Sequence, residues 1–257
     1  MKKIAIITGA SSGMGRRFAE TAAERFGGFD EIWAVARRMD RLNALKEQLP
    51  CPVRPIALDL SDAASFEQLK TLLEEEKPCV RLLINASGFG KFQAVADSRP
   101  EDNLNMVDVN CKAVMALCQL CLPYLADGSR VINIASVAAF QPIPYINVYA
   151  ATKAFVLSFS RALNRELKPK GVRVMAVCPF WTKTEFFDRA VVGKEAVVKK
   201  YVVMYDPKDI VNRAWKDLAR GRDMSIYGIV ARGQKNLVKL LPHSLVMSIW
   251  MNQQKLP

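Results

Sequence analysis

Residues 4–15 read IAIITGASSGMG, and this stretch decides the fold. Its first four residues are apolar and rich in isoleucine, which predicts a buried strand, and the helical pattern RRFAETAAERF follows at residues 16–26. Glycines at a strand-to-helix junction let the backbone turn tightly and approach a pyrophosphate, which the free N–H groups of the helix N-terminus stabilise. The sequence therefore predicts a dinucleotide site, with cofactor contacts from Gly9, Ser11, Ser12, Met14 and Gly15.

Short β-branched segments alternate with amphipathic stretches along most of the chain. Strands are expected at residues 4–8, 32–36, 53–58, 80–84, 131–135, 172–177 and 225–230. Helices are expected near residues 14–26, 39–48, 62–76, 101–125, 148–168 and 207–220. This alternation predicts an α/β fold with a doubly wound, parallel, seven-stranded sheet in a Rossmann-type three-layer sandwich. With no linker in the sequence, we expect one catalytic domain over residues 1–257.

Composition excludes several classes of protein. The chain has 257 residues, of which 51% are hydrophobic and 24% charged, so a disordered chain is excluded. No uninterrupted apolar run reaches the roughly 18 residues that span a bilayer, and residues 1–15 lack the apolar region of a signal peptide. We therefore expect a cytoplasmic protein with six reduced cysteines. His243 is the single histidine, which argues against a metal site and against a Ser-His-Asp triad.

The net charge of +12 is unevenly distributed. Residues 1–150 contain 17 basic and 17 acidic side chains, whereas residues 151–257 contain 20 and 8. A phosphorylated cofactor, an acidic or carrier-linked acyl substrate, or an anionic membrane would suit this basic half, and a solvated basic face is the alternative. No nucleic-acid-binding motif accompanies the charge, so nucleic acid is not an expected partner.

Two regions stand outside the alternation. Residues 185–206 follow the sixth strand, at the sheet edge where ligands bind in this architecture, and are a candidate substrate lid. Residues 234–257 form a basic amphipathic tail, in which Pro242 interrupts the helical pattern. The tail could pack on the domain, on a second subunit or on a membrane surface, and packing on protein is the expectation.

The end of the second strand indicates which dinucleotide binds. A carboxylate at this point would accept hydrogen bonds from the adenosine ribose, but the sequence reads Ala36-Arg37-Arg38, with no acid before Asp40. Two guanidinium groups suit a 2′-phosphate, so NADP is expected rather than NAD. The alternative is that Arg37 and Arg38 merely begin a solvated helix.

Tyr149 and Lys153, in the sequence YAATK, project from one face of a predicted helix. An ammonium near a phenol favours the phenolate, which would lower the pKa of Tyr149 from about 10 toward neutrality and let it act as an acid or base. Ser136 closes the fifth strand at the edge where a nicotinamide would lie. These three residues are therefore the candidate catalytic group.

Taken together, the sequence resembles the short-chain dehydrogenase/reductase family, in its NADP-preferring single-domain branch of about 250 residues. The resemblance covers nearly the whole chain. The residues that carry it are TGxxxGxG at 8–15, Asp59, NASG at 85–88, Asn110, Ser136, Tyr149 and Lys153. It implies a homodimer or homotetramer, in which long helices such as those containing Asn110 and Tyr149 pair the subunits.

The resemblance also implies residue roles. Tyr149 would protonate the substrate carbonyl oxygen as hydride arrives at its carbon, and Ser136 would hydrogen-bond the same oxygen. Lys153 would hold the nicotinamide ribose and acidify Tyr149, Asn110 would anchor a water that feeds protons through Lys153, and Asp59 would contact the adenine. The remaining expected cofactor contacts are Leu60, Asn85, Ala86, Ser87, Gly88, Pro179, Thr182 and Thr184.

The chain departs from the family pattern at two places. The family's Asn-Asn-Ala-Gly is replaced by NASG at 85–88, and Phe180 follows Pro179 where the family usually has glycine. Phe180, Trp181, Phe186 and Phe187 would add apolar walls to the substrate site, although ordinary core packing accounts equally well for some of them. We expect an oxidoreductase that interconverts a carbonyl and a secondary alcohol on a lipophilic substrate, of hydroxysteroid or 3-oxoacyl type. A catalytically silent NADP-binding protein that docks a partner or a membrane through its basic C-terminal region is the alternative.

Overall fold

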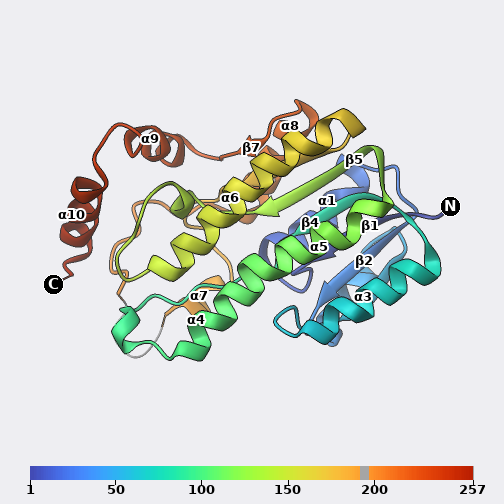
Figure 1. The fold of residues 1–257 in the computed structure, drawn as a ribbon, viewed down its shortest axis with the longest axis horizontal. Coiled ribbons are helices and arrows are strands. Elements are labelled where there is room, and N and C mark those ends of the chain that lie inside the picture. Colours follow the sequence, from blue (N-terminus) through green and yellow to red (C-terminus); the bar gives the residue numbers. More distant parts are fainter. Residues whose placement is uncertain (192–196, 257) are drawn as a thin grey trace.

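The computed structural model describes residues 1–191 and 197–256. All seven strands belong to one parallel sheet, in the order β3-β2-β1-β4-β5-β6-β7 (Figure 1). The strands are β1 (Lys3–Thr8), β2 (Glu31–Ala36), β3 (Val53–Ala57), β4 (Cys79–Asn85), β5 (Leu125–Ile134), β6 (Arg173–Val177) and β7 (Met224–Ser225). The predicted doubly wound α/β sandwich is confirmed.

Ten α-helices are found among the described residues. They are α1 (Gly13–Arg25), α2 (Met39–Gln48), α3 (Ala63–Glu76), α4 (Pro100–Val107), α5 (Ala113–Cys121), α6 (Asn147–Leu167), α7 (Phe186–Ala190), α8 (Pro207–Ala219), α9 (Ile229–Leu237) and α10 (His243–Gln254). The helix expected over residues 101–125 is divided by a π-helical turn, Asp108–Lys112, which separates α4 from α5.

The two faces of the sheet are covered by different helices, because successive strand residues point to opposite sides. Ala5 and Ile7 of β1 pack in a core with α1, α2 and α8, whereas Ile4 and Ile6 pack in a second core with α3, α5 and α6. Both strand faces are therefore buried, which explains the nearly continuous apolar runs of the parallel strands. Figure 1 shows α3, α5 and α6 across one face of the sheet.

The segment from Pro100 to Tyr124 is long and apolar enough to cross a membrane by length and composition. Nearly half of its most apolar window is buried inside the domain, and α5 supplies four residues to the second core. Its apolar character is therefore explained by packing against the sheet.

The seventh strand differs from the prediction. Residues 225–230 were expected to be a strand, but β7 ends at Ser225 and α9 begins at Ile229. Gly228 precedes α9 with φ +93°, a backbone conformation that lies outside the extended region and that side-chain-bearing residues rarely adopt. The C-terminal region therefore contains two helices, α9 and α10, and Pro242 is the residue before the second.

The strand order reverses between β1 and β4, which is the crevice where open α/β sheets bind ligands. Gly15 holds α1 close to this crevice, because a Cβ added to it would lie 2.3 Å from the Gly9 carbonyl oxygen. That oxygen belongs to the backbone, so it cannot move aside without displacing the loop.

Gly15→Ala is therefore expected to destabilise the protein by roughly 3 kcal/mol, since overpacking forces backbone shifts. Gly233→Ala is the matched control, because Gly233 lies in α9 and an added Cβ there meets no atom within 4 Å. The control should gain up to about 1 kcal/mol from helix propensity. Urea unfolding of both variants measures the difference, and equal stabilities would contradict the close approach of α1 to the loop.

Candidate active site

The loop after β1 and the loop after β4 are fastened together at the switch point. Thr8 Oγ1 accepts hydrogen bonds from the backbone N–H groups of Ala86, at 3.1 Å, and Ser87, at 3.2 Å. Gly9 has φ +67°, and a Cβ added to it would lie 2.8 Å from the Ala86 carbonyl group. The loops after β1 and β4 thus approach each other without side chains between them. Their uncovered backbone is what close binding of a dinucleotide pyrophosphate requires.

Arg38 lies directly beside the glycine-rich loop. Its guanidinium donates hydrogen bonds to the hydroxyls of Ser11, at 3.2 Å, and Ser12, at 3.0 Å. The same group donates to Glu185 at 3.0 Å, and Arg41 forms a second ion pair with that carboxylate. Hydrogen bonds from Arg41 and Arg38 hold the pKa of Glu185 below its usual value. Two arginines therefore already hold one anionic group at this end of the crevice.

Several other predicted cofactor residues have side chains with partners inside the protein. Asp59 accepts hydrogen bonds from the backbone and hydroxyl of Ser61 and lies 3.8 Å from an Arg37 nitrogen. Leu60 is buried in the second core. Asn85 is 1% exposed and donates to Asn133 at 2.8 Å. The side chains of Leu60 and Asn85 are thus directed into the protein core.

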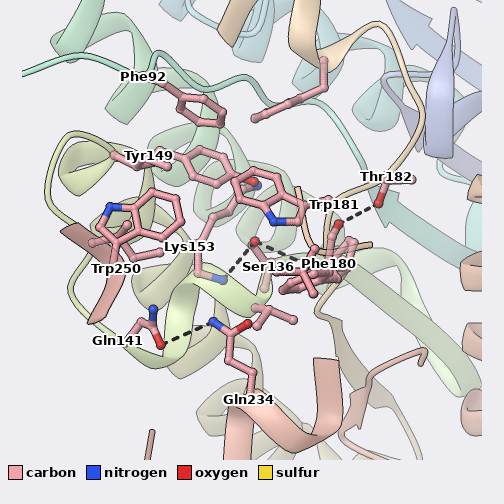
Figure 2. A pocket seen from close by; sticks show the side chains of 18 of the residues that line it. Phe92, Ser136, Gln141, Tyr149, Lys153, Phe180, Trp181, Thr182, Gln234 and Trp250 are labelled. Carbon is pink, nitrogen blue, oxygen red and sulfur yellow. Dashed lines mark hydrogen bonds between the residues drawn. The ribbon is translucent and has the colours of Figure 1, made fainter. Parts of the chain in front are cut away.

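Ser136, Tyr149 and Lys153 meet beneath the adjoining pocket (Figure 2). Ser136 begins a short 3₁₀ turn after β5, where its hydroxyl accepts from the Ala138 N–H at 3.1 Å. Tyr149 and Lys153 come from the first two turns of α6. Lys153 Nζ donates to the Ile134 carbonyl oxygen at 2.8 Å and lies 5.7 Å from the centre of the Tyr149 ring. The structure thus brings the three predicted catalytic residues together.

The pKa of Tyr149 differs from the prediction. Burial raises it to about 12, and the nearby Ser136 hydroxyl offsets only part of that rise. Burial also lowers the pKa of Lys153 to about 8, so its ammonium form is itself disfavoured. The prediction that Lys153 brings the phenol toward neutrality is wrong for this state of the protein, because desolvation is the largest influence on the pKa of Tyr149 and it raises that pKa.

Asn110 lies in the π-helical turn between α4 and α5 and is fully buried. Its amide donates to the Phe89 carbonyl oxygen at 2.8 Å and to the Thr152 hydroxyl at 3.0 Å, and its oxygen accepts from the Phe89 N–H at 3.1 Å. A Cβ added to Gly88 would lie 3.0 Å from the Asn110 oxygen and 3.3 Å from Lys153 Nζ. Asn110 therefore fixes the β4 loop against α6, beside the Lys153 amine.

The pocket above the catalytic group has a cavity volume of about 320 Å³ and is lined mainly by apolar side chains. Phe186 packs on the Tyr149 ring, with 5.4 Å between ring centres, and Phe92 lies 6.0 Å from Phe186. Phe180 lines the pocket and packs edge-on to Trp181 at 6.0 Å. Met14, Ala86, Gly88, Pro179, Thr182 and Thr184 line the same pocket, so it extends from the substrate region to the cofactor crevice.

The predicted lid contributes four of the residues that line this pocket. Phe186, Phe187, Lys200 and Val202 contribute to the wall. The base of the lid is closed by backbone hydrogen bonds, from the Tyr205 N–H to Trp181 at 2.8 Å and from the Lys183 N–H to Tyr205 at 3.0 Å. Residues 192–196 of the predicted lid lie outside the described residues.

The family model for short chain dehydrogenases matches residues 3–194 of this chain. This match covers most of the sequence, including the glycine-rich loop, Ser136, Tyr149 and Lys153. The chain belongs to the short-chain dehydrogenase/reductase family.

Curated members of the family that resemble this short-chain dehydrogenase/reductase differ in the substrates their names state. A sulfoacetaldehyde reductase of Chromohalobacter salexigens is 36% identical over 193 residues, which are 72% of this chain and 75% of the relative. The human very-long-chain 3-oxoacyl-CoA reductase is 28% identical over 261 residues, which are 98% of this chain and 79% of the relative. These two relatives belong to one family, but the substrates that their names state are of different classes.

Solved structures of the family resemble this chain over almost its whole length. A short-chain dehydrogenase from Sphingobium yanoikuyae in complex with NADPH has a TM-score of 0.77 and 28% identity, covering 94% of this chain and 96% of that one. A family member from Burkholderia phymatum in complex with NAD has a TM-score of 0.78 and covers 92% of each chain, but at 23% identity it shows the fold alone. Members of this family thus bind nicotinamide dinucleotides of both kinds.

Several residues that shape the site were not predicted from sequence. Thr8 was part of the glycine-rich motif but received no role of its own, although its position at the strand end could have indicated one. Gln141 and Gln234 face each other in the pocket with 3.4 Å between their amide groups (Figure 2). Trp250 and Gln254 come from α10 and have no local sequence signal, because their partners lie far away in the chain.

The buried amine of Lys153 makes stability depend on pH. Its pKa is about 8 in the folded chain and 10.5 when unperturbed, so the unfolded chain binds more protons between these values and stability rises with pH across this range. Lys153→Met removes that dependence. We compare the free energy of unfolding of the variant with that of the parent protein at each pH. The variant-minus-parent difference is expected to be larger at pH 7 than at pH 10, by roughly 2 kcal/mol.

Urea unfolding at the two pH values measures this difference. The loss of the hydrogen bond to the Ile134 carbonyl affects both measurements and largely cancels in the comparison. The same relative stability at pH 7 and pH 10 would show that the Lys153 amine keeps its ordinary pKa.

Proposed function

We propose that this protein is an NADP(H)-dependent oxidoreductase that interconverts a carbonyl group and a secondary alcohol on a lipophilic substrate. The observation that carries the proposal is the position of Ser136, Tyr149 and Lys153 at the floor of an apolar pocket that continues into the nucleotide crevice. Two hydroxyl groups and an amine are the polar groups of that floor, and they suit a substrate with one reacting oxygen.

Each residue has a distinct task in the direction of reduction. The Tyr149 phenol, with a pKa of about 12, is protonated at neutral pH and therefore available as an acid. An alkoxide is a stronger base than a phenolate, so the proton passes readily from Tyr149 to the developing alkoxide. Ser136 donates a second hydrogen bond to the same oxygen. Lys153, with a pKa of about 8, can return a proton to the phenolate.

The nicotinamide cofactor supplies or accepts the hydride. The residues present fit such a group, since Gly9 and Gly88 leave backbone uncovered along the crevice, where a Cβ would collide with neighbouring atoms. Gly9, Ser11, Ser12 and Gly15 would hold the pyrophosphate. Lys153 would hold the nicotinamide ribose, and Thr182 and Thr184 line the pocket at the nicotinamide end.

The pocket walls support a lipophilic substrate. Phe92, Trp181, Phe186 and Phe187 form a continuous aromatic cluster around Tyr149. Gln141 and Gln234 offer a polar group away from the reacting centre, which would suit a second oxygen on the substrate. A hydroxysteroid and a 3-oxoacyl thioester both remain consistent with this arrangement.

The preference for NADP is supported by the contacts of Glu185. Arg38 and Arg41 hold its carboxylate beside the serines of the glycine-rich loop, which is the position expected for a 2′-phosphate. Glu185 therefore stands in for that phosphate, and binding of NADP would displace it. Arg37 is directed toward Asp59, so Arg38 is the stronger candidate for contact with the phosphate.

The proposed protein forms homo-oligomers and is located in the cytoplasm. Leu104 and Val107 on α4, Met115 on α5 and Phe155 on α6 expose apolar side chains, where a second copy of the chain could pair with them in a homodimer or homotetramer. All six cysteines are free thiols, which supports a reducing cytoplasmic location.

The alternative of a catalytically silent protein gains no support from the site, since the Tyr149 phenol, the Lys153 amine and the Ser136 hydroxyl lie together.

A panel of apolar ketones should contain compounds that consume NADPH. Tyr149→Phe is expected to lower kcat by 10²- to 10⁴-fold, because it removes the proton donor and leaves the ring in place. Tyr201→Phe is the matched control, since that ring also packs on the aromatic cluster and lies 5.2 Å from Trp181. Absorbance of NADPH follows the reaction. A panel without turnover would favour the silent protein, and parental turnover by Tyr149→Phe would exclude the phenol as the acid.

Binding of the two oxidised cofactors to Arg38 and Glu185 variants tests the NADP preference. Arg38→Ala should weaken NADP⁺ binding 10- to 100-fold and leave NAD⁺ binding nearly unchanged, because a charge-assisted contact to the 2′-phosphate is lost. Glu185→Gln should strengthen NADP⁺ binding severalfold, because a competing carboxylate is removed. Isothermal titration calorimetry gives both affinities, with Arg99→Ala, directly before α4, as a remote control. Equal losses for the two cofactors in Arg38→Ala would refute the assignment.

A further inference from the structure

Helices α9 and α10 lie together at one end of the molecule and expose large apolar side chains (Figure 1). We call these residues the C-terminal apolar surface; they are Ile229, Val230, Leu237, Leu240, Leu245 and Ile249. Ile229 is 83% exposed and Leu240 is 82% exposed, which is nearly the full area of these side chains. Soluble proteins rarely gather so many exposed aliphatic residues without a partner for them.

The α10 part of this surface is fastened to the rest of the domain. Trp250 Nε1 donates to the Pro144 carbonyl oxygen at 3.0 Å. Gln254 is 1% exposed, and its side chain accepts from the N–H groups of Lys199 and Lys200 and donates to the Lys200 carbonyl oxygen. Four hydrogen bonds therefore fix α10 to the domain and to the lid. The exposed apolar residues belong to a defined surface and not to a frayed chain end.

The same surface surrounds the entrance of the substrate pocket. Leu237 from α9, Ile249 from α10 and Val202 from the lid all line the pocket, and all three are also largely exposed, by 53%, 49% and 62%. A residue that both lines a cavity and faces solvent lies at its mouth. The mouth therefore includes aliphatic side chains from α9, α10 and the lid, and the exposed Lys200 lies there with them.

The charged side chains of the C-terminal segment have one sign. Residues 224–257 contain Arg232, Lys235, Lys239 and Lys255 and no aspartate or glutamate. Lys199 and Lys200 add two exposed cations where the lid meets α10. Exposed aliphatic residues with interspersed cations are the composition of surfaces that bind peripherally to anionic lipid bilayers.

We propose that α9, α10 and the adjoining rim of the lid dock on the surface of an anionic membrane, with the mouth of the pocket facing the lipid. A second copy of the chain is the other candidate occupant. A twofold contact through this surface would bring the cations of residues 224–257 against the same cations of the partner, with no acidic residue in the segment to balance them. Charge complementarity therefore favours the lipid.

Docking in this orientation gives the substrate a route that avoids water. A lipophilic ketone or alcohol dissolved in the bilayer would pass the rim formed by Val202, Leu237 and Ile249 directly into the aromatic pocket. This consequence rests on the proposed lipophilic substrate, whereas the docking itself depends only on the surface.

Flotation with phospholipid vesicles tests the docking. The intact protein is expected to float with vesicles of phosphatidylcholine and phosphatidylglycerol at 50 mM NaCl, less with phosphatidylcholine alone, and less again at 500 mM NaCl, because salt screens the cations. Ile229→Ser with Leu240→Ser should weaken partitioning roughly tenfold, because both side chains insert into the interface. Neither residue lines the pocket. Leu104→Ser is the matched control, since it removes a 65% exposed leucine from α4.

The outcomes separate this inference from the proposed activity. Intact protein that stays in the unfloated fraction with anionic vesicles overturns the docking, whatever its turnover. Loss of self-association in the Ile229/Leu240 double variant, without vesicle binding by the parent, assigns the surface to a second copy and also overturns it. NADPH consumption with a water-soluble ketone should be the same in the double variant and the parent. Absence of turnover in both, with vesicle binding retained, would refute the activity and leave the docking intact.

Discussion

The placement of Tyr149 and Lys153 together at the floor of the pocket is the constraint on which the site depends. With α6 packed over the end of β5, the Lys153 side chain is 4% exposed and the Tyr149 ring is half-buried, and the Lys153 amine has the Ile134 carbonyl oxygen as its hydrogen-bond acceptor. Burial disfavours each charged form, so it raises the pKa of the phenol and lowers that of the amine. The protein thereby holds a protonated acid next to an amine that exchanges its proton near neutral pH.

The sheet topology explains why this pair lies beside a nucleotide crevice. Parallel strands end at one edge, and the order β1-β4-β5 brings the loops after these three strands together. Thr8 fastens the first loop to the second, and Asn110 fastens the second to α6. Cofactor and substrate regions therefore share one continuous wall, and a change in either loop affects both. The C-terminal helices α9 and α10 line the part of the pocket where it opens to solvent.

Sequence patterns predicted the parts of the fold and site that are local. The glycine-rich junction, the four-residue spacing of Tyr149 and Lys153 and the apolar strands each follow from neighbouring residues. The short β7 was missed because α9 begins directly after Gly228, whose positive φ is a backbone conformation that hydrophobicity does not reveal. The pKa of Tyr149 was predicted in the wrong direction, because burial of α6 depends on the whole domain. The anchoring of the lid by Gln254 joins positions 54 residues apart and leaves no periodic signal.

The most direct test is a titration of Tyr149 followed by nuclear magnetic resonance in protein labelled with ¹³Cζ-tyrosine, with the signal assigned through Tyr149→Phe. In the cofactor-free protein the phenol should remain protonated through the neutral range and ionise with a midpoint near 12. A midpoint near neutrality in the free chain would contradict the view that desolvation controls this pair.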